Sequence, residues 1–278
     1  GNLILATAAR DLPGMADVDS SLLLFCREVK KDVTVVLSGE CADEVFGGYP
    51  WFTQQEQTVA TTFPWIRNID ERMKLFKPEL INKLRPHDYL NNRYQQAVSE
   101  VPSLCGEDPV EKRMREMFYL NITRFMPTLL DRKDRMSMAV GLEARVPFCD
   151  HRLIEYVWNI PWSMKNYGGI EKAVLRMALK GLVPDKVLSR KKSPYPKTHH
   201  PAYLAAVRKG VRFILNDSDE PLNRLIDVGA VRQFAASDAA ALNFPWFGQL
   251  MGGPQLLAYL IQVNYWLSSY KVMVDVDV

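Results

Sequence analysis

The spacing of apolar residues over the first 50 positions predicts helical segments and one strand. Residues 1–10, GNLILATAAR, fit either a strand or the end of a helix, because ten positions do not separate the two periods. The run SLLLFCREVKK has apolar residues at helical spacing, and we expect Asp19 and Ser20 to cap that helix. Residues 33–37, VTVVL, are an apolar run that predicts a buried strand of a parallel sheet. A helix beginning near Ala42 would complete a helix, strand, helix order, which is typical of an α/β fold.

The rest of the chain has mainly helical patterns. Residues 111–145 predict one long helix, or two helices broken at Pro127, and residues 150–160 predict another. The final third is also helical, with turn breaks. Because one strand is too few for an α/β domain, either the fold is mostly α or part of a sheet lies outside this sequence. Residues 171–180 predict an amphipathic helix with an apolar side formed by Ala173, Val174, Met177 and Ala178.

Composition narrows the class of protein. The 278 residues are 47% hydrophobic and 24% charged, which is ordinary for a globular protein and excludes a fibrous or disordered class. No apolar window approaches the roughly 20 residues needed to span a bilayer, and the first residues lack the order of a signal peptide. We therefore expect a cytoplasmic protein without membrane contacts. The 35 basic and 32 acidic residues are mixed along the chain, a balance that does not favour nucleic-acid binding.

Cysteine and histidine positions predict no metal site or disulfide. The four cysteines stand far apart without a C-x-x-C pair, and the four histidines lack zinc-ligand spacing. We expect reduced thiols that are buried or partly buried, at Cys26, Cys41, Cys105 and Cys149.

The segment with the clearest chemical character is VVLSGECADEVFGGY, residues 35–49. Ligands bind beyond the carboxyl ends of strands in open α/β sheets, and the predicted strand ends at Ser38 and Gly39. A glycine lets a ligand approach the backbone, and free amides at a helix start favour an anion such as phosphate. Asp43 suits Mg²⁺ held against phosphate oxygens, and Glu40 would face the organic part of the substrate. Alternatively, Glu40, Asp43 and Glu44 are simply the acidic first turn of a helix, stabilised by its dipole.

Charged residues between 130 and 150 form two further candidates. Asp131 and Arg135, with the neighbours 132–134, can pair along a helix face, and such pairs usually belong to a solvated surface. Glu143 and Arg145 have apolar neighbours on both sides, where a buried carboxylate and guanidinium could orient each other.

Two basic segments lie further along the chain. Lys172 would occupy the first turn of a helix, where it opposes the dipole, so we expect a negative partner: Glu171, a nearby acid or a phosphate. Residues 190–197, RKKSPYPK, form a basic loop stiffened by proline. This loop could close over an anionic substrate, or it could be a solvated surface loop.

Three blocks of the sequence together carry a resemblance. They are VVLSGECADEVFGGY at residues 35–49, SMAVGLEARVPFCD at residues 137–150 and GIEKAVLR at residues 169–176. In this order they resemble the C-terminal synthetase domain of the glutamine-dependent asparagine synthetases, and three ordered blocks are far more specific than one. The resemblance implies an α/β domain of the PP-loop ATP pyrophosphatase (adenine nucleotide α-hydrolase-like) type. It would be mostly helical here because the first strands of its parallel sheet are missing.

The resemblance also implies a reaction. Such a domain activates the β-carboxylate of aspartate with ATP and Mg²⁺, giving β-aspartyl-AMP and pyrophosphate, and ammonia obtained from glutamine then displaces AMP. Ser38 and Gly39 would contact the nucleotide, and Asp43 would help to hold Mg²⁺ and pyrophosphate. Glu40 would support formation of the acyl-adenylate, and Lys172 matches the catalytic lysine that stabilises negative charge.

Other activities on the same scaffold are the alternatives. β-Lactam synthetases and peptide macrocyclases are related enzymes, and Glu40 favours asparagine because the lactam-forming relative resembles this sequence except for a tyrosine at that position. A catalytically silent interaction module is the alternative from another class, and the intact Glu40, Asp43 and Lys172 speak against it.

Two departures from the family pattern bear on activity. The phosphate loop S-G-G-x-D-S is absent, because residues 17–21, DVDSS, lack the glycines that make the amide cradle. Residue 1 is glycine rather than the N-terminal cysteine of the family's glutaminase domain, so we expect that domain to lie outside this sequence. We therefore expect residues 1–278 to be the C-terminal part of the synthetase domain and to be inactive alone. Expected partners are aspartate, ATP and ammonia, with a homodimer as one possible assembly.

Overall fold

The protein folds mainly into helices around one small parallel sheet. The structure is a computed structural model that describes residues 1–66, 68–193, 195, 198, 200–238, 245–246 and 251–274. None of the helices in these ranges is both long and apolar enough to cross a membrane.

The described elements follow one another as helices with two short strands among them. The strands are β1 (Val35–Leu37) and β2 (Glu143–Arg145). The helices are α1 (Asn2–Arg10), α2 (Asp17–Val29), α3 (Ala42–Phe46), α4 (Gln55–Thr58), α5 (Ile69–Met73), α6 (Pro78–Leu84), α7 (Pro86–Ser99), α8 (Pro109–Leu120), α9 (Met126–Met138), α10 (His151–Trp158), α11 (Trp162–Lys165), α12 (Ala173–Ala178), α13 (Asp185–Leu188), α14 (Pro201–Asn216), α15 (Val228–Ala236) and α16 (Gly253–Ser269).

The first two helices show which conformation residues 1–10 adopt and correct the predicted start of the second helix. Residues 2–10 are helical rather than extended, and α1 packs on α2 and α9 through an apolar cluster formed by Ala6, Leu22, Leu23, Cys26, Met136 and Leu142. The expected caps of α2, Asp19 and Ser20, are wrong, because the helix begins at Asp17 and its N-cap is Ala16. Asp19 lies inside the first turn, where its carboxylate accepts a hydrogen bond from the Met15 amide at 2.8 Å.

The sheet confirms a parallel strand but not its burial. β1 pairs in parallel with β2, with Val36 opposite Ala144. Val36 packs against the α2 and α9 cluster, whereas Val35 and Leu37 are 41% and 76% exposed, so only one face of the strand is covered. The strand β2 was not predicted, because EAR has neither β-branched residues nor an alternating pattern.

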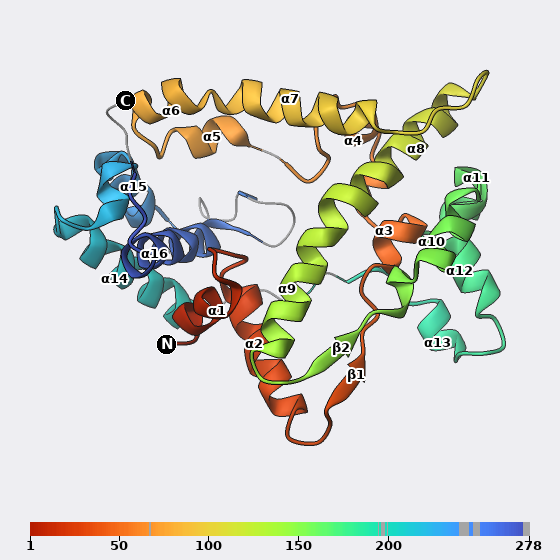
Figure 1. The fold of residues 1–278 in the computed structure, drawn as a ribbon, viewed down its shortest axis with the longest axis horizontal. Coiled ribbons are helices and arrows are strands. Elements are labelled where there is room, and N and C mark those ends of the chain that lie inside the picture. The colour runs from red at the N-terminus through yellow and green to blue at the C-terminus, as the bar shows by residue number, and fades with distance from the viewer. Residues whose placement is uncertain are drawn as a thin grey trace.

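The long helical stretch in the middle of the chain is not broken at Pro127. α8 and α9 run in line diagonally through the centre of the molecule (Figure 1), joined by a π-helical segment, Asn121–Phe125. Pro127 lies in the first turn of α9. A proline clashes with the carbonyl four residues earlier in an α-helix, and the wider π turn just before it accommodates that conflict.

Different groups of elements lie on the two sides of this long helical axis. Figure 1 shows α14, α15 and α16 on one side and α10 to α13 on the other. The largest apolar core lies in the first group. The helices α14, α15 and α16 confirm the helical prediction for the final third. In the second group α10 is confirmed, whereas α12 is shorter than predicted and its Met177 is 64% exposed.

Candidate functional site

A cavity of about 800 Å³ lies beyond the carboxyl end of β1. Its walls come from the segment after β1 and from α9, the α1–α2 connection and the basic loop that follows α13. Five basic side chains line it against three acidic ones, a balance that suits an anionic ligand. These charged residues are Arg10, Arg72, Arg132, Arg190, Lys192, Glu40, Asp43 and Glu44.

The strand end places Ser38 and Gly39 at the edge of the cavity, as predicted. The Ser38 amide donates to the Arg145 carbonyl at 2.8 Å, which extends the β1–β2 pairing by one bond. A Cβ atom added at Gly39 would meet nothing within 4 Å, so the space beside this backbone is open. The geometry therefore allows a ligand to approach the chain closely here.

Glu40 is held by two basic residues of α9. Its Oε1 lies 3.4 Å from Nη2 of Arg132 and 3.6 Å from Nζ of Lys133. Its Oε2 is buried and has no hydrogen-bond donor among the described residues. The expectation that residues 132–134 belong to a solvated surface is wrong for Arg132, which is only 7% exposed. One oxygen of Glu40 is thus fixed, and the other is left to accept a hydrogen bond.

Asp43 forms ion pairs with two lysines from distant parts of the chain. Lys172 contacts its Oδ1 and Lys192 contacts its Oδ2. Burial opposes ionisation of Asp43, but the two ammonium groups outweigh it and hold the pKa of the carboxyl below its ordinary value. The predicted negative partner of Lys172 is therefore confirmed as a nearby acid. Glu40 and Asp43 line the same cavity, whereas Lys172 is not among the lining residues and is linked to the cavity through its ion pair with Asp43.

The neighbouring Glu44 behaves in the opposite way. It is 1% exposed and accepts a hydrogen bond from the Tyr49 hydroxyl. Burial raises the pKa of Glu44, because no ammonium group pairs with it directly. The three acids of the motif therefore occupy three different environments, which an acidic helix turn exposed to solvent would not produce.

The Gly47-Gly48 pair allows close packing, with Gly47 against Trp162 and Gly48 against Asp43. Gly47 has φ of +75° and a Cβ there would lie 2.6 Å from the Trp162 ring. A Cβ at Gly48 would lie 1.9 Å from Oδ1 of Asp43, closer than any real contact. The sequence pattern did not assign a role to these glycines, although their place directly after the acids was a signal for close packing.

Arg176 organises the two lysine-bearing segments. Its guanidinium donates to the carbonyls of Leu188 and Arg190 and to the Glu171 carboxylate. Glu171 in turn accepts from the Lys192 amide at 2.9 Å. The basic loop is therefore tied to the start of α12, with Lys192 turned toward Asp43. Pro194, Pro196 and Lys197 of this loop lie outside the described residues.

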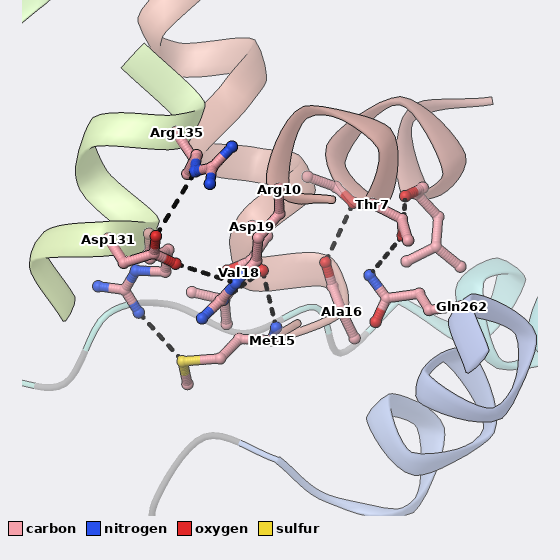
Figure 2. Close-up of polar contacts among 12 residues, drawn as sticks. Thr7, Arg10, Met15, Ala16, Val18, Asp19, Asp131, Arg135 and Gln262 are labelled. Atoms are coloured by element: carbon pink, nitrogen blue, oxygen red, sulfur yellow. Dashed lines mark hydrogen bonds and ion pairs between the residues drawn. The ribbon is translucent and has the colours of Figure 1, made fainter. Parts of the chain in front are cut away.

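A second charged network, drawn in Figure 2, lies beside the cavity and includes the lining residues Arg10, Met15 and Arg132. Arg10 donates to Oδ2 of Asp19 at 3.1 Å and lies 3.5 Å from Asp131. Asp131 also lies 3.5 Å from Arg135, so this predicted pair is confirmed. Arg132 donates to the Met15 sulfur at 3.1 Å, which holds its guanidinium beside the α1–α2 connection.

Two other segments that the sequence patterns singled out do not line the cavity. Glu143 and Arg145 form an ion pair of 2.7 Å, but their side chains are 51% and 64% exposed, so the pair is not buried. The alternation of a strand places residues two apart on the same face, and this face of β2 is open. The second is the segment that looked similar to a phosphate loop, whose Asp17 lies in the first turn of α2. The Asp17 carboxylate accepts a hydrogen bond from the Thr198 amide at 2.7 Å.

Comparison with known proteins finds relatives of this chain. The family model described as asparagine synthase matches residues 2–268. The chain is 53% identical over 270 residues to glutamine-hydrolysing asparagine synthetase 3 of Bacillus subtilis, which covers 97% of this chain and 44% of that protein. It is 29% identical over 229 residues to asparagine synthetase 1 of the same organism, covering 71% of this chain and 36% of that protein. Human asparagine synthetase is 35% identical over 93 residues, 32% of this chain and 15% of that protein.

The chain thus spans less than half the length of these relatives. The family match, in contrast, extends over nearly the whole chain and includes every residue of the cavity described above. The chain therefore belongs to the asparagine synthase family.

Proposed function

We propose that the chain carries the ATP-dependent, amide-forming part of a glutamine-hydrolysing asparagine synthetase with a PP-loop ATP pyrophosphatase fold. The observation that carries the proposal is the convergence of Lys172 and Lys192 on Asp43, at the cavity that also contains Glu40. Residues 1–278 would be the C-terminal part of the synthetase domain of a cytoplasmic enzyme. A homodimer, and ammonia supplied by glutamine hydrolysis elsewhere in the protein, belong to the same proposal.

The reaction needs a site that stabilises negative charge twice. A β-carboxylate oxygen of aspartate attacks the α-phosphorus of ATP, and pyrophosphate leaves with the electrons of the broken P–O bond. Ammonia then attacks the acyl carbon, loses a proton and displaces AMP, giving asparagine. Cationic groups beside the phosphates favour both steps, because charge develops on oxygen atoms each time.

The cavity residues have chemistry that matches these steps. Ser38 and Gly39 would lie against the nucleotide at the open backbone of the strand end. Lys172 would stabilise charge on the transferred and leaving oxygens. Glu40 would orient the substrate through its free oxygen, while Arg132 fixes the other oxygen.

The acidic side chains also fit the magnesium that this family reaction implies. Mg²⁺ is usually bound through one or two carboxylates together with substrate phosphates. Asp43 faces the cavity, and both of its oxygens are paired with lysines. Phosphate oxygens could take over these lysines and leave Asp43 free to bind the metal. Glu40 has one oxygen without a hydrogen-bond donor among the described residues. Asp43 would hold Mg²⁺, which would neutralise charge on the pyrophosphate when bound.

The proposal is tested on the protein extended to its natural start. AMP and asparagine are measured with ATP, Mg²⁺, aspartate and ammonia, for wild type, Glu40→Gln and Lys172→Ala. We expect aspartate-dependent AMP with matching asparagine, and losses of about a hundredfold or more in both variants. Glu143→Gln is the matched control, since Glu143 lies on the exposed face of β2. The chain of residues 1–278 alone should make little asparagine.

Other outcomes separate the alternatives. AMP formation that does not depend on aspartate, and depends instead on a lactam or macrocycle precursor, would show that the proposed substrate is wrong. That result would leave the fold assignment unchanged. Absence of Mg-ATP binding by the full-length protein would contradict an enzymatic role and favour an interaction module.

A further inference from the structure

Two cysteines that are far apart in the sequence meet beside Glu40. Cys41 follows Leu37, the last residue of β1, by four positions, and Cys149 follows Arg145, the last residue of β2, by four positions. Leu37 and Arg145 are paired in the parallel register. The two chain segments therefore leave the sheet side by side, and each reaches its cysteine after the same number of residues.

The sulfur atoms form a chain of contacts. The thiols of Cys41 and Cys149 influence each other, raising the pKa of Cys41 and lowering that of Cys149, and Cys149 donates to the Met126 sulfur at 3.6 Å. Cys41 is 2% exposed and lines the cavity, whereas Cys149 is only partly buried. Phe46 and Phe148, which lie near the two cysteines in the sequence, have ring centroids 6.2 Å apart, so the two segments stay packed together beyond the sheet. A disulfide requires a Cβ to Cβ distance of about 3.8 Å and a sulfur to sulfur distance of about 2.05 Å, which segments packed in this way can reach.

We propose that Cys41 and Cys149 form a two-thiol modification site that exchanges with low-molecular-weight disulfides and closes to an intramolecular disulfide. The partly exposed Cys149 thiolate attacks one sulfur of the small disulfide, which forms a mixed disulfide and releases one thiolate. Cys41 then attacks the Cys149 sulfur and releases the second thiolate. The small disulfide gains two electrons, the two cysteines lose them, and their two protons pass to the released thiolates.

The position of the pair connects the disulfide with the cavity. Cys41 stands between Glu40 and α3, and it caps α3 in a left-handed conformation with φ of 72°. A covalent bond would tie this residue to the turn that follows β2. Because Glu40 is its direct neighbour, we expect the bond to shift the Glu40 carboxylate relative to Arg132 and Lys133. Disulfides of proteins in reducing compartments are usually transient and redox-sensing. We expect the disulfide between Cys41 and Cys149 to be of this reversible kind.

The other two cysteines provide internal controls. Cys105 is exposed and Cys26 is buried in the α1–α2 core. Each of the four cysteines lies in a different tryptic peptide: residues 11–27 for Cys26, 32–67 for Cys41, 94–112 for Cys105 and 146–152 for Cys149. Mass spectrometry therefore identifies the state of each thiol separately.

The test treats the native, full-length protein with oxidised glutathione, blocks remaining thiols with an alkylating agent, and maps the peptides. We expect peptides 32–67 and 146–152 to be recovered joined, while Cys105 carries glutathione and Cys26 is alkylated only after unfolding. Cys149→Ser should abolish the joined peptide and Cys105→Ser should preserve it. In Cys41→Ser, Cys149 should accumulate as a stable glutathione adduct. Recovery of the two peptides apart, with Cys105 fully modified, would overturn the proposal.

The effect on the cavity rests on the proposed function and is measured separately. A shift of about 1 Å at a catalytic group costs up to about a hundredfold in rate, so oxidised wild type should lose at least about tenfold in aspartate-dependent AMP formation. Dithiothreitol should restore it, and Cys149→Ser should keep its rate under oxidation. An unchanged rate in fully joined protein would refute the coupling to Glu40. A reduced enzyme without activity would contradict the proposed function, while the peptide map still decides the disulfide.

Discussion

Replacing Gly48 by alanine tests whether the Gly-Gly pair exists to position Asp43. The new methyl group would lie 1.9 Å from Oδ1, 2.8 Å from Cγ and 3.1 Å from Cα of Asp43. Gly48 is not among the glycines with positive φ, so alanine is compatible with its backbone and the effect isolates the steric conflict. The carboxylate cannot simply rotate away, because both of its oxygens are paired with lysines.

The size of the effect follows from these contacts. Relief of the clash requires the Asp43 carboxylate to move by about 1 Å, and displacement of a catalytic group by that amount costs up to about a hundredfold in rate. Overpacking a site of this kind typically destabilises by about 1–3 kcal/mol. We therefore expect Gly48→Ala to fold, to unfold at a lower temperature and to lose most of its aspartate-dependent AMP formation.

The assay combines thermal unfolding with AMP formation in the full-length protein. Gly229→Ala is the matched control: it lies in α15, where its Cβ would meet only Asp227, at 3.3 Å, and it should leave the rate unchanged. In an Asp43→Ala background the closest clash is gone, so Gly48→Ala should destabilise less than in wild type. Wild-type rate in Gly48→Ala, or an equal destabilisation in both backgrounds, would refute the reasoning.

Four further predictions concern charged groups. Lys192→Ala should raise KM for ATP, while Lys191→Ala, at an exposed neighbour, should not, as steady-state kinetics will show. The pKa of Asp43 is lowered from 3.8, so its contribution to stability is present above that pH and lost below it; Asp43→Asn should flatten acid unfolding curves in this range. Burial raises the pKa of Glu44 above 4.5, so Glu44→Gln should be more stable relative to wild type at pH 7 than at pH 4, by chemical denaturation. Burial lowers the pKa of Lys165 to about 8, so the free energy of unfolding should rise between pH 8 and 10.5, and Lys165→Met should remove that rise.

The sequence located the centre of the candidate site because its residues lie in local motifs. The strand end, the helix at Ala42 and the acids between them are set by neighbouring residues, and these elements formed where expected. The partner of Lys172 could be restricted to an acid or a phosphate by the helix dipole alone. Choosing Asp43 required the fold, because 129 residues separate the two side chains.

The parts that the sequence did not predict depend on tertiary packing. Arg132 looks like any other charged residue of α9, and only the docking of that helix on the segment after β1 turns it toward Glu40. The strand β2 has no strand pattern of its own and is extended because it pairs with β1. The contact between Cys41 and Cys149 follows from the register of the same two strands, which periodicity cannot determine.

Charge illustrates why composition alone could not indicate the ligand. The chain as a whole is nearly balanced at +3, and no segment of its sequence stands out as strongly basic except the loop after α13. Folding brings that loop and α12 to a single carboxylate, so that Lys172, Lys192 and Asp43 together carry one positive charge in excess. A partly buried excess charge is costly unless it is compensated, and a phosphate oxygen of the nucleotide would compensate it. The same three side chains thus hold each other in place without a ligand and favour an anionic one when it binds.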